Sequence, residues 1–310
     1  MRDVALIGVG QIPVGEHWDM GLRQLALGAI QAALHDAGIE QVDALIVGNA
    51  LGGNLSSQNH LGALIADYAG LRGVSALRVE AADASGGMAL HQGYLAVASG
   101  LAETVLVLGV EKATDRTGSE RDTALATVLD ADYEAGSGAT PAGVAALLMR
   151  RYMHEYGVAL DQFEGFSVNA HANGALNPFA MYRNRLRPGA FAKAPVVAEP
   201  VNLFDSAPEG DGAAAVILTA AEHAADRVAR PIRVRGSAAA TDTLALHNRA
   251  DMLFLQAANL AAGRAYEQAG IVPADIEVAE LHDSFTILTA LQLEAAGFAR
   301  RGEGCQMAAD

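Results

Sequence analysis

Short apolar runs separated by helical patterns constrain the fold of this chain more than any other feature. Runs rich in Val, Ile and Leu occur at 4–9, 44–47, 76–80, 104–110, 213–219, 232–234 and 276–281. Because these runs are apolar at most positions, rather than at every second one, they predict strands that are covered on both faces. Helical patterns at 22–34 and 86–99 lie between them. The sequence therefore predicts an α/β fold with a mixed or mostly parallel sheet and helices on both sides.

Composition excludes several classes of protein. Hydrophobic residues make up 51% of the chain and charged residues 18%, so it can bury a large core and is not disordered. The 21 basic and 36 acidic residues give a net charge of −15, which argues against nucleic acid or an anionic membrane as the main partner. The single cysteine excludes internal disulfides and multi-cysteine metal sites, and we expect no metal. No run is long enough for a membrane helix and the start lacks a signal-peptide pattern, so we expect a cytoplasmic protein.

The stretch 112–209 interrupts the alternation of strands and helices. It contains polar turns and short helical patterns at 143–156 and 161–173, which is typical of a domain inserted between two strands. We predict a first half formed by 1–111 and 210–225, an inserted loop or cap domain at 112–209, and a second half at 226–310. Long insertions of this kind are usually functional.

A faint internal repeat supports the two halves. Both 33–47 and 265–279 contain a helical pattern, an Ala-Gly-Ile stop, an acidic turn and a strand-like run. Helix ends of this type are also common in alanine-rich chains, but the order of several features favours duplication. The second half then lacks a helix and two or three strands, so either the chain is truncated or something else covers an open sheet edge.

The stretch 79–90 carries the sharpest functional signal. A strand-like run ends, Asp83 follows among small residues, and a helical pattern begins. This arrangement places a polar side chain at a helix N-terminus, where free amides and the helix dipole stabilise negative charge. The alternative is that Asp83 or Ser85 is only the helix N-cap.

These residues resemble a known family. Val-Glu-Ala-Ala-Asp-Ala-Ser-Gly-Gly at 79–87 resembles the nucleophile turn of the thiolases of the sterol-carrier-protein type, which typically read V-E-A-A-C-A-S-G-G. Stretches at 109–115, 152–157, 169–178, 211–218 and 280–285 agree in order, and the last resembles the H-D-C-F motif of that branch. The resemblance spans essentially the whole chain. It implies a thiolase-like fold of two duplicated, layered α/β halves, the second incomplete, with a long inserted loop domain.

Two departures from the family pattern affect the expected chemistry. Asp83 occupies the position of the nucleophilic cysteine, and a carboxylate is a far poorer nucleophile towards a thioester than a thiolate. The G-H-P motif and the second catalytic cysteine of the family lie beyond the point where this sequence stops. We assign no catalytic role to Cys305 and predict that it is an exposed bystander.

The resemblance also implies roles for other residues. It implies that His282 donates to the thioester oxygen, although His282 could instead be bonded to Asp283 or to backbone. His171 could face a pocket or lie on a solvated helix face. The predicted catalytic residues are Asp83 and His282, and the predicted substrate-binding residues are His171, Asn173, Asn177 and Ser284. Acyl-CoA contacts are also expected at Pro178 and near Lys112.

Two functions of different classes remain open. The first is an enzyme of acyl-CoA metabolism, of the acyltransferase family, that makes or breaks a carbon–carbon bond, with retro-aldol cleavage as the variant that needs no cysteine. The second is a non-catalytic thiolase-like protein that binds acyl-CoA or a partner chain. In both cases the resemblance implies a coenzyme A thioester as ligand, no permanently bound cofactor, a homodimer, and a small OB-fold or zinc-ribbon protein as a further partner.

Overall fold

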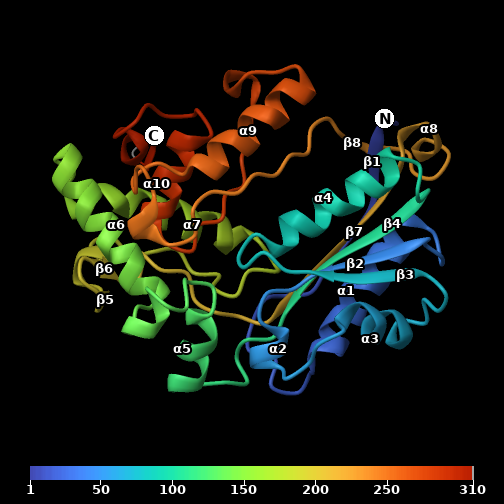
Figure 1. Ribbon diagram of the computed structural model, residues 1–310, viewed down its shortest axis with the longest axis horizontal. Coiled ribbons are helices and arrows are strands. Elements are labelled where there is room, and N and C mark those ends of the chain that lie inside the picture. Colours follow the sequence, from blue (N-terminus) through green and yellow to red (C-terminus); the bar gives the residue numbers. More distant parts are fainter. Residues whose placement is uncertain (309–310) are drawn as a thin grey trace. The chain divides into compact units, whose positions relative to one another are not determined.

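Six strands form one mixed sheet in the first of two compact units, which comprises Met1–Ala124 and Glu209–Ser237. The structure is a computed structural model that describes residues 1–308 (Figure 1). The strand order is β3-β2-β4-β7-β1-β8, with β2 parallel to β3 and β4 and the other neighbours antiparallel. The strands are β1 (Val4–Gln11), β2 (Ala44–Gly48), β3 (Ser75–Val79), β4 (Thr104–Glu111), β7 (Gly212–Ala220) and β8 (Ile232–Val234). They confirm the mixed α/β prediction and the first six predicted runs.

Helices cover both faces of this sheet, and alternate strand residues enter different cores. Leu106 and Leu108 of β4 are buried in a cluster with α1 (Leu22–Ala37) and α3 (Leu61–Tyr68). Val105 and Val107 of the same strand are buried in a second cluster with α4 (Ser85–Ala98). This two-sided burial explains why the strands are apolar at successive positions. The shorter helices are α2 (Gly52–Leu55), α5 (Gly118–Ala126) and α8 (Ala221–Ala224).

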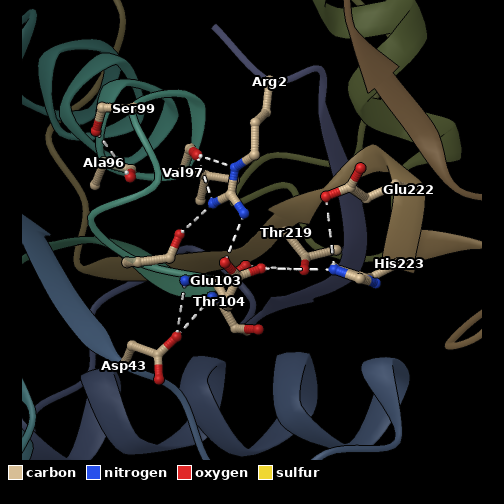
Figure 2. Close-up of polar contacts among 11 residues, drawn as sticks. Arg2, Asp43, Ala96, Val97, Ser99, Glu103, Thr104, Thr219, Glu222 and His223 are labelled. Atoms are coloured by element: carbon tan, nitrogen blue, oxygen red, sulfur yellow. Dashed lines mark hydrogen bonds and ion pairs between the residues drawn. The ribbon is translucent and has the colours of Figure 1, made fainter.

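Arg2 fixes the C-terminal end of α4 (Figure 2). Its guanidinium donates to the Val97 carbonyl at 2.9 Å and forms an ion pair of 2.5 Å with Glu103. The Glu103 amide donates to Asp43 Oδ2 at 2.9 Å, and the Thr219 hydroxyl donates to the Glu103 carbonyl at 2.9 Å. The last carbonyls of a helix have no partner within the helix, so Arg2 supplies one. These contacts hold α4 in place and thereby position the turn at its other end.

The second unit comprises Leu125–Pro208 and the residues from Ala238 onward, and it is mainly helical. Its helices are α6 (Pro141–Tyr156), α7 (Glu164–Leu176), α9 (Gln256–Ala269) and α10 (Thr286–Ala295), and β5 (Val196–Ala198) pairs with β6 (Val201–Asn202). Short 3₁₀ helices are η1 (Ala135–Ser137), η2 (Leu160–Phe163), η3 (Phe191–Lys193), η4 (Leu246–Asn248), η5 (Pro273–Asp275) and η6 (Gly304–Ala308). Its core includes Met149, Tyr152, Phe163, Ile287 and Leu291. Within residues 1–308, the structure contains no helix with the length and apolar character that crossing a membrane requires.

The predicted strand at 276–281 is wrong, because the chain there is irregular. A strand needs a neighbour to take up its backbone hydrogen bonds, and none pairs with this segment among the described residues. Val278 is accordingly 80% exposed. The helical part of the repeat is present in both copies, since α1 ends at Gly38 with a φ of 63° and α9 ends at Gly270 with a φ of 68°.

Candidate functional site

A tight turn joins β3 to α4 and carries Asp83. Ala82 has a φ of 48°, a left-handed conformation that residues with a side chain rarely adopt. The Ala82 amide donates to Glu80 Oε1 at 2.6 Å. The Ser85 hydroxyl accepts from the Ala81 amide at 2.9 Å and donates to the Ala82 carbonyl at 2.6 Å. Glu80 and Ser85 therefore hold the turn from its two ends.

Asp83 lies in the exposed part of this turn, just before the helix begins. The N-cap residue of α4 is Ala84, which makes no side-chain cap bond, and Ser85 is the first residue of the helix. A Cβ atom added at Gly86 or Gly87 would meet nothing within 4 Å. The first helical turn is thus uncrowded on that side. A carboxylate at this position lies beside the start of α4, where the positive end of the helix dipole stabilises negative charge.

A buried ion pair lies in the same unit, just after the end of β4 and just before the start of β7. Asp211 is 0% exposed and accepts from Lys112 Nζ at 2.6 Å and from the Thr114 hydroxyl at 2.7 Å. Burial opposes ionisation of Asp211, but the hydrogen bonds from Lys112 and Thr114 dominate and lower its pKa to about 2. Lys112 also bonds Asp115 at 2.6 Å. Its burial lowers the pKa of the ammonium, yet the two carboxylates outweigh burial and raise it. The Lys112 charge is therefore already matched inside the protein.

The second unit contains a cavity of about 310 Å³. It is lined by α7, by the segments 180–182 and 204–208, and by Asp283 and the start of α10. Phe166 and Phe204 supply apolar surface, and His171, Asp205 and Asp283 supply polar groups. A cavity of this size with a few convergent polar groups is typical of a small-molecule site.

Asp205 is a buried acidic residue in the wall of this cavity. It is 2% exposed, accepts from the Thr286 hydroxyl at 2.5 Å through Oδ1, and accepts from the Asn202 amide at 3.0 Å through Oδ2. Burial raises the pKa of Asp205, while these two hydrogen bonds lower it, and the net shift is upward. A buried carboxyl group with a raised pKa in a cavity is a candidate for a functional role.

His171 lines the cavity, which agrees with the first of its two predicted alternatives, a side chain that faces a pocket. Its Nδ1 lies 3.0 Å from the Asn184 carbonyl oxygen, and its ring meets Phe204 edge-on at 5.7 Å. A carbonyl oxygen can only accept, so His171 donates this hydrogen bond through Nδ1.

The other predicted residues of the second unit lie at different places. The backbone of His282 is held by Gln292, which donates to the His282 carbonyl at 2.6 Å, and the His282 side chain is exposed. Ser284 accepts from the Ala207 amide at 2.9 Å through its carbonyl. Asn177 closes a turn by accepting from the Phe179 amide at 2.9 Å, and Asn173 is exposed on α7. The cavity lining includes His171 but none of these four. Their proposed roles in binding or catalysis stay predictions.

Cys305 is not the exposed bystander predicted from the sequence. It is 2% exposed and packs in the core of the second unit. Burial raises the pKa of its thiol to about 12, with the Tyr152 hydroxyl opposing and the Glu294 carboxylate reinforcing the shift. The expectation was wrong because the residues around Cys305 in the sequence are mostly polar and predict a surface segment, whereas this segment packs against the core. Gly304 shows it, since a Cβ there would lie 2.4 Å from the Ala290 carbonyl oxygen.

Sequence reasoning missed Asp205 as a site residue. Its neighbours Leu203 and Phe204 gave one usable signal, because an acid directly after two large apolar residues is unusual in a polar connection. The rest of the cavity could not be found this way, because its lining comes from segments that are far apart in the sequence.

One unit of the chain is a mixed α/β sheet with helices on both faces and the other is mainly helical, and comparison with known proteins shows the family. The model of the thiolase N-terminal domain matches residues 4–194, and that of the thiolase C-terminal domain matches residues 238–310. The chain belongs to the thiolase family, in the branch that contains sterol carrier protein 2 and steroid-cleaving aldolases.

Individual relatives cover nearly the whole chain. An acetyl-CoA acetyltransferase of Methanothermobacter thermautotrophicus is 42% identical over 306 residues, which are 98% of this chain and 79% of the relative. A steroid side-chain-cleaving aldolase of Thermomonospora curvata is 30% identical, over 99% of this chain and 80% of the relative. Among solved structures, the Ltp2-ChsH2(DUF35) aldolase superimposes with a TM-score of 0.86 at 28% identity, covering 99% of this chain and 80% of that one.

Proposed function

We propose that this protein is an enzyme that cleaves, or in reverse forms, a carbon–carbon bond of a coenzyme A thioester by aldol chemistry without an acyl-enzyme. The observation that carries the proposal is Asp83, an exposed carboxylate on the turn before α4 where the resembling thiolases have cysteine. Membership of the thiolase family and a relative named as a side-chain-cleaving aldolase support it.

A carboxylate at this turn suits proton transfer better than acyl transfer. Its attack on a thioester would give a mixed anhydride, and it is a weak nucleophile. As a base, Asp83 accepts the proton of a β-hydroxyl group on the substrate. The oxygen then forms a carbonyl, the Cα–Cβ bond breaks, and its electron pair passes into the thioester as an enolate. Return of a proton to Cα gives a shortened acyl-CoA and an aldehyde or ketone.

The residues of the second unit have supporting roles in this proposal. His282 donates to the thioester oxygen and stabilises the enolate, as the family resemblance implies. We assign binding of the thioester chain to His171, Asn173, Asn177 and Ser284. Among these, His171 has direct structural support, because it lines the cavity beside Asp205.

The test is a retro-aldol assay with 3-hydroxybutyryl-CoA, 3-hydroxy-3-methylbutyryl-CoA and longer 3-hydroxyacyl-CoA thioesters, in which acetyl-CoA is measured by mass spectrometry. We expect cleavage by the parent chain and a fall in kcat of about 100-fold or more in Asp83→Asn, because a positioned base contributes about that much. Asp226→Asn, which makes the same change at an exposed site of the first unit, should keep full activity. Thioester binding without turnover across the panel would support the non-catalytic binding protein instead.

We also propose two protein partners. The first is a second copy of this chain, joined at β3, which among the described residues is an edge strand paired with β2. The second is a small partner protein of the OB-fold or zinc-ribbon type, supported by the solved aldolase that carries a DUF35 partner. Co-purification of a tagged chain with such a protein, and its effect on retro-aldol activity, would test the second partner.

A further inference from the structure

Another cavity, of about 320 Å³, lies in the first unit. Its walls are the start of α1, the end of α2 with the loop that follows, Leu64 of α3, and residues 112–116 after β4 (Figure 1). The turn that carries Asp83 takes no part in this lining, and the reaction proposed above assigns no role to any lining residue. The cavity is therefore a candidate site for a separate ligand.

The lining of this cavity is mostly basic where it is ionisable. Three of its ionisable side chains are basic, Arg23, Lys112 and Arg116, and one is acidic, Asp115. The chain as a whole has the opposite balance, with a net charge of −15. Because the Lys112 ammonium already bonds two carboxylates at 2.6 Å, the two arginines are the cations that an incoming anion can use.

The two arginines differ in how they are held. Arg23 is exposed and forms no ion pair within residues 1–308, and its guanidinium lies 5.8 Å from the centre of the Tyr68 ring. Arg116 donates to the Leu55 carbonyl through Nε at 3.2 Å, which holds its guanidinium at the cavity wall. Its ion pair with Glu120 is 3.2 Å long and solvent-exposed, so this pair is weak and an anion can compete for the guanidinium.

Two further features of the lining favour an acceptor group. The Ser56 hydroxyl is buried and has no hydrogen-bond partner among the described residues. A buried hydroxyl without a partner is unfavourable, and an occupant that accepts from it removes this cost. α1 begins after Gly21, which has no side chain to cap the first amides, and the first turn contains no acidic residue. The positive end of the α1 dipole is therefore uncompensated at the cavity.

Apolar side chains form much of the remaining lining. Leu22 and Leu55 are buried, and Leu64 is half-buried. Inorganic phosphate would leave this apolar surface uncovered, and a second negative charge would be repelled by Asp115. An anion with a single charge and a short hydrocarbon body matches both parts of the lining.

We propose that this cavity binds the anion of a small monocarboxylic acid. The carboxylate accepts from Arg23, Arg116 and the Ser56 hydroxyl, and the hydrocarbon body packs against Leu22 and Leu55. Arginine suits this role because its planar fork binds both oxygens of a carboxylate. The inference does not depend on the proposed function, since no thioester takes part in it.

Calorimetric titration with sodium butyrate and with butyramide tests the requirement for charge, because the two molecules have nearly the same shape. We expect butyrate to bind the parent chain at least about tenfold more tightly than butyramide, and its affinity should fall as salt is raised. Arg23→Gln/Arg116→Gln should remove this preference, and Ser56→Ala should weaken butyrate binding by about threefold or more. The control Arg227→Gln/Arg230→Gln makes the same charge change at exposed sites of the first unit and should bind butyrate like the parent.

The inference is overturned if the parent chain does not prefer butyrate, if the preference survives in the double variant, or if inorganic phosphate binds more tightly than butyrate. Displacement of butyrate by acetyl-CoA would also overturn it, because the carboxylate would then occupy the thioester site. If the double variant does not fold, Arg23→Gln alone, at an exposed side chain, takes its place and should weaken the preference. A chain without retro-aldol activity that still prefers butyrate would refute the proposed function and leave this inference standing.

Discussion

Position 83 decides which chemistry the turn before α4 can perform. We expect the parent chain to show no thiolysis or Claisen activity with acetoacetyl-CoA, because Asp83 cannot hold an acyl group as a thiolate does. Asp83→Cys should acquire a covalent acetyl adduct, detectable by mass spectrometry of the intact protein. Acylation of the parent at Cys305 would contradict this account, since that thiol is buried. If neither chain is acylated, the exchange at 83 is not the feature that separates this protein from thiolases.

Asp211 should give the folded protein a distinctive dependence on acid. Its pKa falls from 3.8 to about 2 on folding, so its ionised form stabilises the native state above pH 3.8 and this stabilisation disappears as the pH falls towards 2. The shift corresponds to about 2 kcal/mol. We expect the unfolding free energies of the parent and Asp211→Asn to converge by about that amount between pH 4 and pH 2.

Urea titrations across this range measure the effect. The exposed Asp226→Asn variant should run parallel to the parent at every pH. A constant difference between the parent and Asp211→Asn would show that the ion pair with Lys112 does not hold the Asp211 pKa down. If Asp211→Asn does not fold, Lys112→Met/Asp211→Asn removes both charges together and replaces it in the comparison.

At the level of single residues, the sequence was a better guide to candidate reactive groups than to which side chains are buried. Asp83 and its helix start could be found because the whole motif is contiguous. Asp205 could not, since its burial depends on Thr286 and Asn202, which lie in other segments. The prediction that Cys305 is exposed was wrong for the same reason, because its burial depends on the packing of other segments.

Among the elements, the segment 300–308 contains the single cysteine, so labelling of its thiol can measure how stably this segment is docked. The Tyr152 hydroxyl of α6 donates to Glu294 Oε1 of α10 at 2.6 Å, and the same oxygen accepts from the Gly304 amide at 2.9 Å. We expect Cys305 to resist iodoacetamide at pH 8 in the native protein, because it is buried and its thiol pKa is about 12. It should react fully in urea.

Tyr152→Phe tests the hydrogen bonds that hold this segment. Removing the hydroxyl leaves the Glu294 carboxylate with one donor fewer in a buried site, which should cost about 1–3 kcal/mol and speed native labelling of Cys305. Tyr133→Phe, at a tyrosine that is 67% exposed, is the matched control and should label like the parent. Rapid labelling of the parent chain would show that the segment is not stably docked.

The strands show where pattern reading succeeds and where it stops. Six runs became strands because each has a hydrogen-bonded neighbour in the sheet. The run at 276–281 also contains Ile, Val and Leu, but within residues 1–308 no strand pairs with it, and Val278 is 80% exposed. Apolar composition predicts that a segment can form a strand, and the presence of a neighbour decides whether it does.

For the whole molecule, the edge of the six-stranded sheet predicts a dimer. Within residues 1–308, β3 lies at one edge of the sheet, and Leu77 within it is 44% exposed. We expect light scattering at micromolar concentration to give twice the mass of the chain, and Leu77→Lys to give a monomer, because a lysine on an edge strand disfavours pairing. Leu101→Lys, at a site that is 87% exposed and outside the strand, should leave the mass unchanged. A monomeric parent, or a dimeric Leu77→Lys variant, would refute pairing at β3.

The way the Asp83 turn is held has a consequence for how activities diverge within one scaffold. Its hydrogen bonds to Glu80 and Ser85 use no atom of the side chain at 83. A lineage could therefore exchange that side chain and pass from one reaction to another while inheriting the same backbone path. In such a lineage the ancestry would be recorded in the residues that flank the reactive position, and the present activity in a single side chain between them.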